Sequence, residues 1–547
     1  MLSHFASFEF RLARRNPFRS LSFTLSGTSS RIVPGRDLMI ARLRFLTLIW
    51  LCSALVHAAL ATPLTFVIHD DSTGALLPCR VHLRDDAGKP VKAGELPFWR
   101  DHFVCPGHAE LDVAPGRYTY DIEHGPEWTS VTREVLVPES GQISITNRLR
   151  RMADLAKEGW WSGDLHIHRA PEQIELHLRA EDLHIAPVIT WWNKTSLWTN
   201  KALPSNPLVR FDKDRFYRVM GGEDERDGGA LLYFGLSAPF DITGGQRLYP
   251  HSLVYAREIK RKSPRVWIDL EKPFWWDFPA WVAAGIGDSV GIANNHQNRS
   301  GMLNNEAWGR SRTGALQQNP LGNALWTLEI YYHLLNCGLR LPPSAGSASG
   351  VLPNPVGYNR VYVHLDGDLA WDAWWDALRA GKCFVSNGPL LRCRANGQLP
   401  GHGFKVQQDS PLEISIEAAL TSHDPINAVE IIKDGEVVKT VPSEQFSAGR
   451  PSKLPVINFD KSGWFLVRAV TGLTNTFRFA STGPFYVETE GTPRRISKRS
   501  AQFFHDWTLE RIARVKLPDS RHQDEVTQFY RDAEAFWKAR IAEANAP

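Results

Sequence analysis

The chain has 547 residues, with a hydrophobic fraction of 43% and a charged fraction of 22%. These fractions are typical of a folded globular protein, and the length is too great for one ordinary core, so we expect several domains. The 63 basic and 59 acidic residues give a net charge of +4. This near balance excludes the strongly basic class of nucleic-acid-binding proteins, and no nucleic-acid partner is expected.

An export signal is predicted over residues 39–61. Two arginines, an apolar run and a small-x-small site ending at Ala61 follow one another there, as in a cleaved signal peptide. The apolar run is too short for a stable membrane span. We therefore expect an exported chain, periplasmic or extracellular, cleaved near Ala61. Residues 1–38 are interpreted as an extension or a misassigned start; a transit segment or an uncleaved anchor are the alternatives.

Residues 62–150 alternate short apolar runs of period two with turn signals, which predicts a β-sandwich. The stretch VAPGRYTYDIEHG resembles the small carboxypeptidase-regulatory-like sandwiches that precede many secreted hydrolase domains. Cys79 and Cys105 both fall in this region. A disulfide between them is plausible in an exported chain, although the sequence alone leaves the pairing open.

Three further regions follow. Strand-like and helical runs alternate over 151–388, which indicates an α/β domain with a largely parallel sheet, open or barrel-like. The pattern over 389–490 is again that of a β-sandwich. The tail 491–547 contains two amphipathic, charged segments, 496–514 and 521–541, that predict helices. The expected fold is thus multidomain: a central α/β domain flanked by N-terminal and C-terminal β-sandwiches, plus C-terminal helices.

The stretch GDLHIHRAP carries the most specific chemistry. His166 and His168 are two residues apart, and on a strand such residues point to the same face. Two imidazoles on one face can bind one metal ion, although histidine is also an ordinary strand residue. Asp164 stands where it can orient an imidazole or the turn behind the metal ligands.

With GDLHIH, the segments AEDLHIAPVIT, GGEDER and PVGYNRVYV…WWDALRAGKCFVSNGPLL resemble the PHP-type metallohydrolases, and most closely their carbaryl-hydrolase-like CehA/McbA branch. The resemblance covers about residues 155–392. It implies a distorted α/β barrel with metal ions at the carboxyl ends of the strands. It also implies hydrolysis of phosphoester, ester, amide or carbamate bonds. The HxH motif of the family corresponds to His166 and His168, and its Gly-x-Glu motif ends at Glu223.

Several other family ligands are replaced. The Thr-Asp-His motif reads Thr-Trp-Trp-Asn here, the His-Pro position reads Glu-Lys-Pro at 271–273, and Ser-Asp-x-His reads Ser-Ala-Ser-Gly at 347–350. We therefore expect a reduced site with one divalent ion, zinc, manganese or iron, held by His166, His168 and Glu223. His296, which follows an apolar strand in GIANNHQNR, is the candidate fourth ligand or a merely structural histidine.

The remaining candidates surround these ligands. Glu225 and Glu271 are candidate catalytic bases, and Lys272 could supply positive charge where the family has a cation. Candidate substrate-binding residues are Trp191, Trp192, Trp276 and Arg299. The alternative for the tryptophans is core packing, and for the arginine an ordinary surface charge.

Two functions follow from these residues. The first is an exported metal-dependent hydrolase that acts on a small-molecule or glycan-like substrate through a metal-activated water. The second is an inactive relative that binds a glycan, a lipid headgroup or a protein partner. The HxH and Gly-x-Glu motifs favour the hydrolase, and the replaced ligands favour the binding protein.

Overall fold

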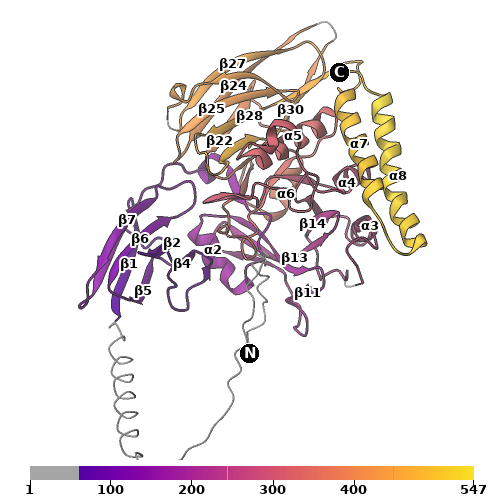
Figure 1. Ribbon diagram of the computed structural model, residues 1–547. Coiled ribbons are helices and arrows are strands. Elements are labelled where there is room, and N and C mark those ends of the chain that lie inside the picture. The colour runs from indigo at the N-terminus through magenta and orange to yellow at the C-terminus, as the bar shows by residue number, and fades with distance from the viewer. Residues whose placement is uncertain (1–60, 243, 408–409, 448) are drawn as a thin grey trace, which may run out of the picture. The chain divides into compact units, whose positions relative to one another are not determined.

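The computed structural model describes residues 61–242, 244–407, 410–447 and 449–547. The expected extension 1–38 and nearly all of the expected signal peptide lie outside these residues. The described chain is multidomain and rich in β-sheet, with helices at its C-terminal end, as the sequence predicts (Figure 1). None of its helices has both the length and the apolar character needed to cross a membrane.

The N-terminal region forms two sheets that share one core. One sheet contains β1 (Thr62–Asp70), β5 (His108–Val113) and β8 (Ile143–Leu149). The other has the order β3 (Phe98–Trp99), β4 (His102–Cys105), β2 (Cys79–Asp85), β6 (Gly116–Glu123) and β7 (Val131–Val137). Burial alternates strictly along β5, as expected of a strand with one face on a core. Cys79 and Cys105 lie opposite each other on β2 and β4 as free thiols, with their sulfurs 3.6 Å apart.

The central sheet closes into a barrel. Its strands are β9 (Trp160–Gly163), β10 (Ile185–Trp192), β13 (Arg215–Arg226), β14 (Gly229–Phe234), β15 (Trp267–Leu270), β16 (Ser289–Ala293), β19 (Pro343–Ala345), β20 (Arg360–His364) and β21 (Cys383–Ser386). Short strands lie in its loops: β11 (Thr195–Ser196), β12 (Leu208–Phe211), β17 (Gln297–Asn298) and β18 (Gly301–Met302).

The barrel sheet is mixed, so the expectation of a largely parallel sheet was wrong. The β10–β13, β15–β16 and β16–β19 pairs are parallel, but β13, β14 and β15 are antiparallel neighbours. The reason is local. Only Asp227 and Gly228 separate β13 from β14, and a two-residue connection can join only antiparallel strands.

Helices accompany the barrel strands: α2 (Ile174–Ala180), α3 (Ser252–Lys262), α4 (Phe278–Ala283), α5 (Gly322–Asn336) and α6 (Trp371–Arg379). The largest hydrophobic core lies between them and the sheet. It contains many of the tryptophans, including Trp191, Trp275, Trp276, Trp281 and Trp374. Most paired tryptophans of the sequence are thus packing residues.

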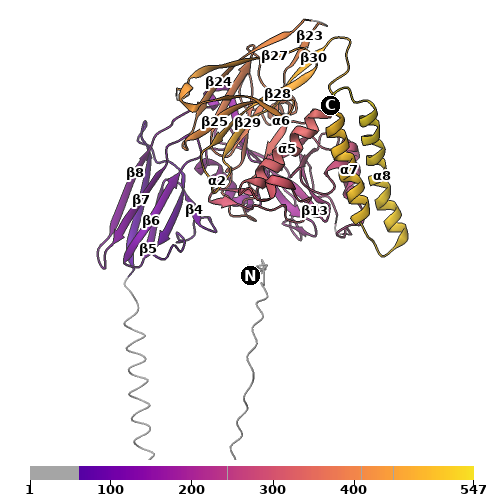
Figure 2. The ribbon, with the colours of Figure 1, turned by 45° about the horizontal axis from the view of Figure 1, so that its top comes forward.

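The C-terminal sheets also share a core. One layer contains β22 (Leu390–Ala395), β24 (Leu412–Thr421) and β27 (Pro451–Phe459). The other contains β23 (Gly403–Val406), β25 (Ile426–Lys433), β26 (Glu436–Val441), β28 (Gly463–Thr471), β29 (Phe479–Thr482) and β30 (Phe485–Thr489), and these two layers are visible in Figure 2. Because β21 pairs with β29, this second layer continues the barrel sheet.

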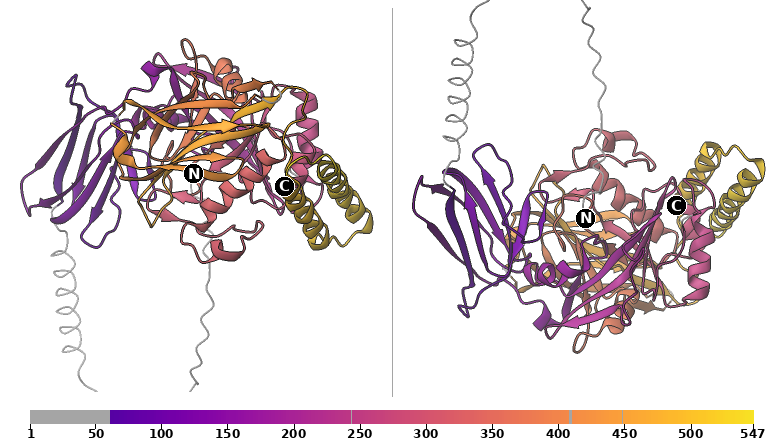
Figure 3. Two further views of the ribbon diagram at one scale, coloured as in Figure 1. Left: turned by 90° about the horizontal axis from the view of Figure 1, so that it is seen from above. Right: turned by 90° about the horizontal axis from the view of Figure 1, so that it is seen from below.

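Two terminal helices, α7 (Lys498–Arg514) and α8 (Ser520–Ala542), match the predicted segments. They lie side by side in every view, and both views in Figure 3 place them away from the N-terminal strands. The pair of helices α7 and α8 is attached to α4 by buried polar contacts. Arg511 Nε donates to Asp277 Oδ1 at 2.8 Å, and Trp537 Nε1 donates to the Pro279 carbonyl at 3.2 Å.

Candidate metal centre

The two histidines of GDLHIH meet at their Nε2 atoms, which are 3.0 Å apart. Strand β9 ends at Gly163, but the chain stays extended beyond it, because Ile167 forms parallel bridges with Val188 and Ser349. Ile167 therefore points into a hydrophobic cluster on one side. His166 and His168 share the other side, as the two-residue spacing predicts.

Glu223 completes the cluster from the neighbouring strand β13. Its Oε2 atom lies 3.0 Å from His168 Nε2 and 3.5 Å from His166 Nε2. The oxygen is buried and has no hydrogen bond of acceptable geometry among the described residues. Gly222 lets β13 lie close to the Trp191 ring on the neighbouring strand β10, since a Cβ at position 222 would lie 1.8 Å from that ring.

The three atoms fit a metal ion. A tetrahedral ion with metal–ligand distances of about 2.0–2.1 Å separates its ligand atoms by about 3.4 Å. The three distances in the cluster lie close to this value, and each residue offers one ligand atom. Two imidazoles and one carboxylate suit zinc, manganese or iron. The described chain can therefore hold a metal ion at this point.

Glu271, directly after β15, contacts His166 at Nδ1, the ring nitrogen that does not face the cluster. Its Oε1 atom is 3.3 Å from His166 Nδ1, and it also accepts hydrogen bonds from Asn295 Nδ2 (3.1 Å) and from Lys272 Nζ. Its Oε2 atom accepts from Trp275 Nε1 at 3.0 Å. With both oxygens engaged, Glu271 orients His166, as carboxylates commonly orient metal-bound imidazoles.

Lys272 is almost completely buried, which a charged amine tolerates only with a partner. The ammonium forms an ion pair with Glu271 and lies 4.7 Å from the centre of the Trp275 ring. Its positive charge is thus kept beside the metal cluster. Burial raises the pKa of Glu271, but Lys272 and His166 lower it further, so the carboxyl stays ionised.

Asp164 acts on the backbone rather than on an imidazole ring. Its Oδ1 atom accepts from the amides of His166 and Ser347, both at 3.0 Å, and its Oδ2 atom accepts from the Gly357 amide at 2.7 Å. The fully buried carboxylate therefore fixes the turn that presents the HxH pair.

His296 is not part of the three-residue cluster. Its Nδ1 atom donates to the Asn305 carbonyl at 2.8 Å, which leaves Nε2 unprotonated and without a partner among the described residues. Burial lowers the pKa of His296 to about 3, and Lys272 contributes. The centre of the His296 ring lies 5.3 Å from the centre of the Phe274 ring.

A cavity of about 700 Å³ opens beside the cluster. Glu225, two residues after Glu223 on β13, faces it, and no described residue donates to its carboxylate. Burial, Glu223 and Glu271 raise the pKa of Glu225 to about 8. Trp192 lines the cavity with its ring 5.3 Å from that of His168, and Trp308 lines it from another loop.

The other candidate substrate-binding residues lie elsewhere. Trp191 stacks on Tyr233 in the core at 5.9 Å, since consecutive strand residues face opposite sides. Trp276 is buried under the guanidinium of Arg514, 4.2 Å from the ring centre. Arg299 forms ion pairs with Asp121 and Glu123 on β6 of the five-stranded N-terminal sheet.

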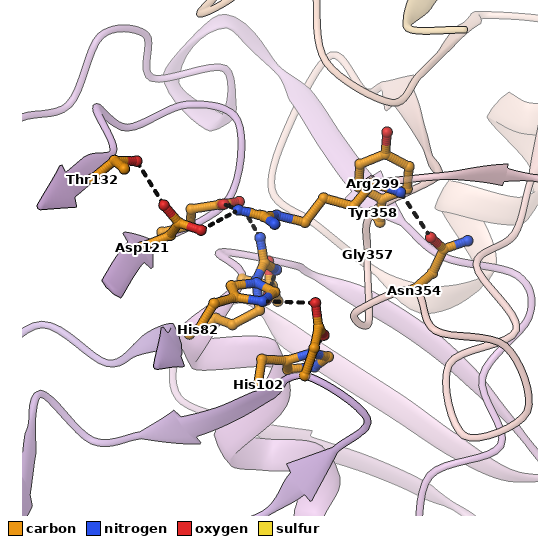
Figure 4. A network of polar contacts seen from close by, with 12 residues as sticks. His82, His102, Asp121, Thr132, Arg299, Asn354, Gly357 and Tyr358 are labelled. Atoms are coloured by element: carbon orange, nitrogen blue, oxygen red, sulfur yellow. Dashed lines mark hydrogen bonds and ion pairs between the residues drawn. The ribbon is translucent and has the colours of Figure 1, made fainter. Parts of the chain in front are cut away.

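A second cluster, His82, Asp101 and His102, also brings potential ligands together (Figure 4). Asp101 oxygens lie 3.1 Å from His82 Nδ1 and 2.9 Å from His102 Nδ1. However, Arg80 Nε donates to His82 Nε2 at 3.0 Å, so neutral His82 carries its proton on Nδ1. That proton faces Asp101, so a metal ion bound at Nδ1 would first have to displace it.

Several residues of the site were not recognised from sequence. Asn295 contacts Glu271, Asn193 accepts from the Glu225 amide at 2.8 Å, and Trp308 forms a wall of the cavity. The paired asparagines after the strand GIA were a usable signal, because polar residues at a strand end commonly line a site. Nothing near Trp308 in the sequence marks it.

No protein-family model matches the chain, and neither a curated protein nor a solved structure matches it. The resemblance to PHP-type metallohydrolases consequently rests on the motifs alone, and the function has to be argued from the geometry of the site.

Proposed function

We propose that the chain is an exported metal-dependent hydrolase with one divalent ion, zinc, manganese or iron, on His166, His168 and Glu223, in a PHP-like barrel. One observation carries this proposal. Glu223 Oε2 is a buried carboxylate oxygen to which no described residue donates a hydrogen bond of acceptable geometry, and it faces two imidazole nitrogens at near-ligand spacing. A buried carboxylate is costly without a positively charged partner, and a metal ion between the three atoms supplies one.

The residues around the cluster have separate roles in this proposal. A divalent ion supplies Lewis acidity and a water molecule of lowered pKa. Glu271 holds His166 by its Nδ1 atom, and Asp164 holds the turn. Glu225 faces the cavity and no described residue donates to its carboxyl group, so it is placed to exchange a proton with water or with a leaving group.

The cavity indicates how a substrate is held. Trp192 and Trp308 offer flat apolar surfaces, while Lys194 and Arg247 place positive charge at the rim. A volume of about 700 Å³ accommodates a small molecule or one to two sugar rings. We propose an ester, amide, carbamate or phosphoester substrate of that size, with its scissile bond toward Glu225.

Elemental analysis of the purified chain beginning at Thr62 tests the proposal. We expect about one zinc, manganese or iron per chain in the wild type, and none in the H166A/H168A variant. The H82A/H102A variant is the matched control, since it removes two buried histidines from the other cluster and should keep the metal.

Absence of metal from the wild type, even after incubation with the three metal salts, would contradict the metal-dependent mechanism. The chain would then be a binding protein, and ligand screening should begin at the Trp192–Trp308 cavity. Loss of metal only in H82A/H102A would place the ion in the second cluster.

A further inference from the structure

One loop connects the metal centre with both flanking regions. Residues 294–302, here called the 294–302 loop, follow β16 and contain β17 and β18. Near its start, Asn295 Nδ2 donates to Glu271 Oε1 at 3.1 Å, and Glu271 in turn contacts His166. The loop therefore touches the group that orients a metal-ligating histidine.

Arg299 anchors the loop to the five-stranded N-terminal sheet. Its Nε atom donates to Glu123 Oε1 at 2.8 Å, and Nη2 contacts both that oxygen and Asp121 Oδ2, the latter at 3.3 Å. Both carboxylates belong to β6. Figure 4 shows the side chain extending from the loop toward Asp121. These contacts span more than 170 positions of the chain.

The backbone of Arg299 is held by two other parts of the molecule. Its amide donates to Asn354 Oδ1 at 3.2 Å, a contact that Figure 4 also shows. Its carbonyl accepts from Arg478 Nη2 at 3.1 Å, and Arg478 lies beside the C-terminal strand β29. Next to it, the Asn298 carbonyl accepts from Thr476 Oγ1 at 2.6 Å. Arg299 is thus held by both sandwich regions and by the barrel.

The anchoring carboxylate is itself part of a buried charge network. Glu123 also pairs with Arg80, which is 3% exposed and pairs in addition with Glu181 beside α2. Burial raises the pKa of Glu123, but Arg80 and Arg299 lower it further, well below its usual range. Removing one member of such a network leaves another charge buried and unpaired, so the geometry is held tightly.

We infer that Arg299 is a positioning residue, through which the two sandwich regions set the 294–302 loop and thereby the Asn295–Glu271–His166 chain. This inference rests on the proposed metal centre. It replaces a substrate-binding role for Arg299, because its guanidinium is engaged by Glu123 and Asp121 and does not line the cavity beside Glu225.

The variant R299A tests the inference, with R392A as its matched control. Arg392 is also a largely buried arginine that pairs across two regions, from β22 to Glu158, but it does not contact the 294–302 loop. Two quantities are measured: hydrogen exchange of the loop amides, and zinc affinity by competition with a chromophoric chelator. E123Q serves as a milder substitution should R299A fail to fold.

We expect R299A to speed exchange in the loop about tenfold or more and to weaken zinc binding about 10-fold, the effect usual for residues behind a metal ligand. R392A should change neither quantity. In an N295A background, R299A should cause no further loss of zinc affinity, because Asn295 carries the effect to Glu271. A purely structural role would not produce this non-additivity.

Equal effects of R299A and R392A, or additive losses in R299A/N295A, would overturn the inference. The two proposals fail differently. A wild type without zinc contradicts the metal centre, and the exchange measurement then still decides whether Arg299 orders the loop. A wild type that binds zinc, with an unchanged loop in R299A and E123Q, contradicts the positioning role alone.

Discussion

Glu271 and His166 are joined on the side of the imidazole ring that faces away from the proposed metal. Glu271 Oε1 lies 3.3 Å from His166 Nδ1, whereas His166 Nε2 faces Glu223 and His168. The ring is therefore held from both sides, and the protonation of Nδ1 is fixed by a carboxylate that is itself ion-paired with Lys272. This arrangement makes the ring a better metal ligand than an isolated histidine.

Neutralising this carboxylate should weaken metal binding. We expect E271Q to bind zinc about 10- to 100-fold more weakly than the wild type, because the amide orients His166 less firmly and no longer offsets the charge of Lys272. Chelator competition measures the change. D224N is the control: Asp224 is equally buried, but it pairs with Arg226 and makes no contact with His166. Similar losses in both variants would argue against an orienting role.

Glu225 should affect turnover but not metal content. With a substrate found by screening esters, amides and phosphoesters, E225Q should lower kcat about 100-fold or more, the usual contribution of a proton-transferring side chain. Its metal content should equal that of the wild type. Thr195 lines the same cavity and has no acid group, so the kcat of T195V should stay within about threefold of the wild-type value. Full activity of E225Q would remove Glu225 from the mechanism.

The stability of the metal-free chain should depend on pH through Glu127. Burial and the neighbouring Asp182 raise the pKa of Glu127 to about 8. Between about pH 4.5 and 8 the folded chain keeps a proton that the unfolded chain releases, so this group makes stability fall as pH rises, by up to about 1.4 kcal/mol per pH unit.

The variant E127Q should therefore flatten the dependence of the unfolding free energy on pH across that window. Urea unfolding at several pH values measures it, and E139Q, at an exposed position, should leave the slope unchanged. A slope in E127Q as steep as that of the wild type would mean that Glu127 is ionised in the folded chain.

Replacing Gly222 should disrupt the strand that carries Glu223. A Cβ at this position would lie 1.8 Å from the indole of Trp191. We therefore expect the free energy of unfolding of G222A to be lower than that of the wild type by about 1–3 kcal/mol or more. Thermal unfolding measures the loss. The control is G367A, where a Cβ would meet open space. An unchanged melting temperature in G222A would show that Trp191 moves aside at little cost.

The parts of the site that sequence could predict are those set by local geometry. The HxH pair shares one face because strand residues two apart always do. The same rule explains why Trp191 and Trp192 do not both face the cavity, although both were candidate substrate-binding residues with core packing as the alternative. Only Trp192 reaches the cavity wall.

The other features of the site depend on contacts between residues far apart in the sequence, which a local pattern does not reveal. Arg299 has the sequence context of a loop arginine near the site, and nothing local reveals that its partners are Glu123 and Asp121 on a different domain. The mixed sheet was missed for a different reason. The Asp-Gly pair at 227–228 is a local signal for a turn between antiparallel strands, and the alternation of strand-like and helical runs does not reveal it.

The contact between Gly222 and Trp191 also sets an expectation for homologous chains. The indole fills the space that a side chain at 222 would need, so the two positions cannot change independently. Chains with a small residue at 191 are free to carry a larger one at 222, whereas chains with tryptophan at 191 should keep glycine. Covariation of these two positions among homologues would show that the indole and the missing side chain were selected together.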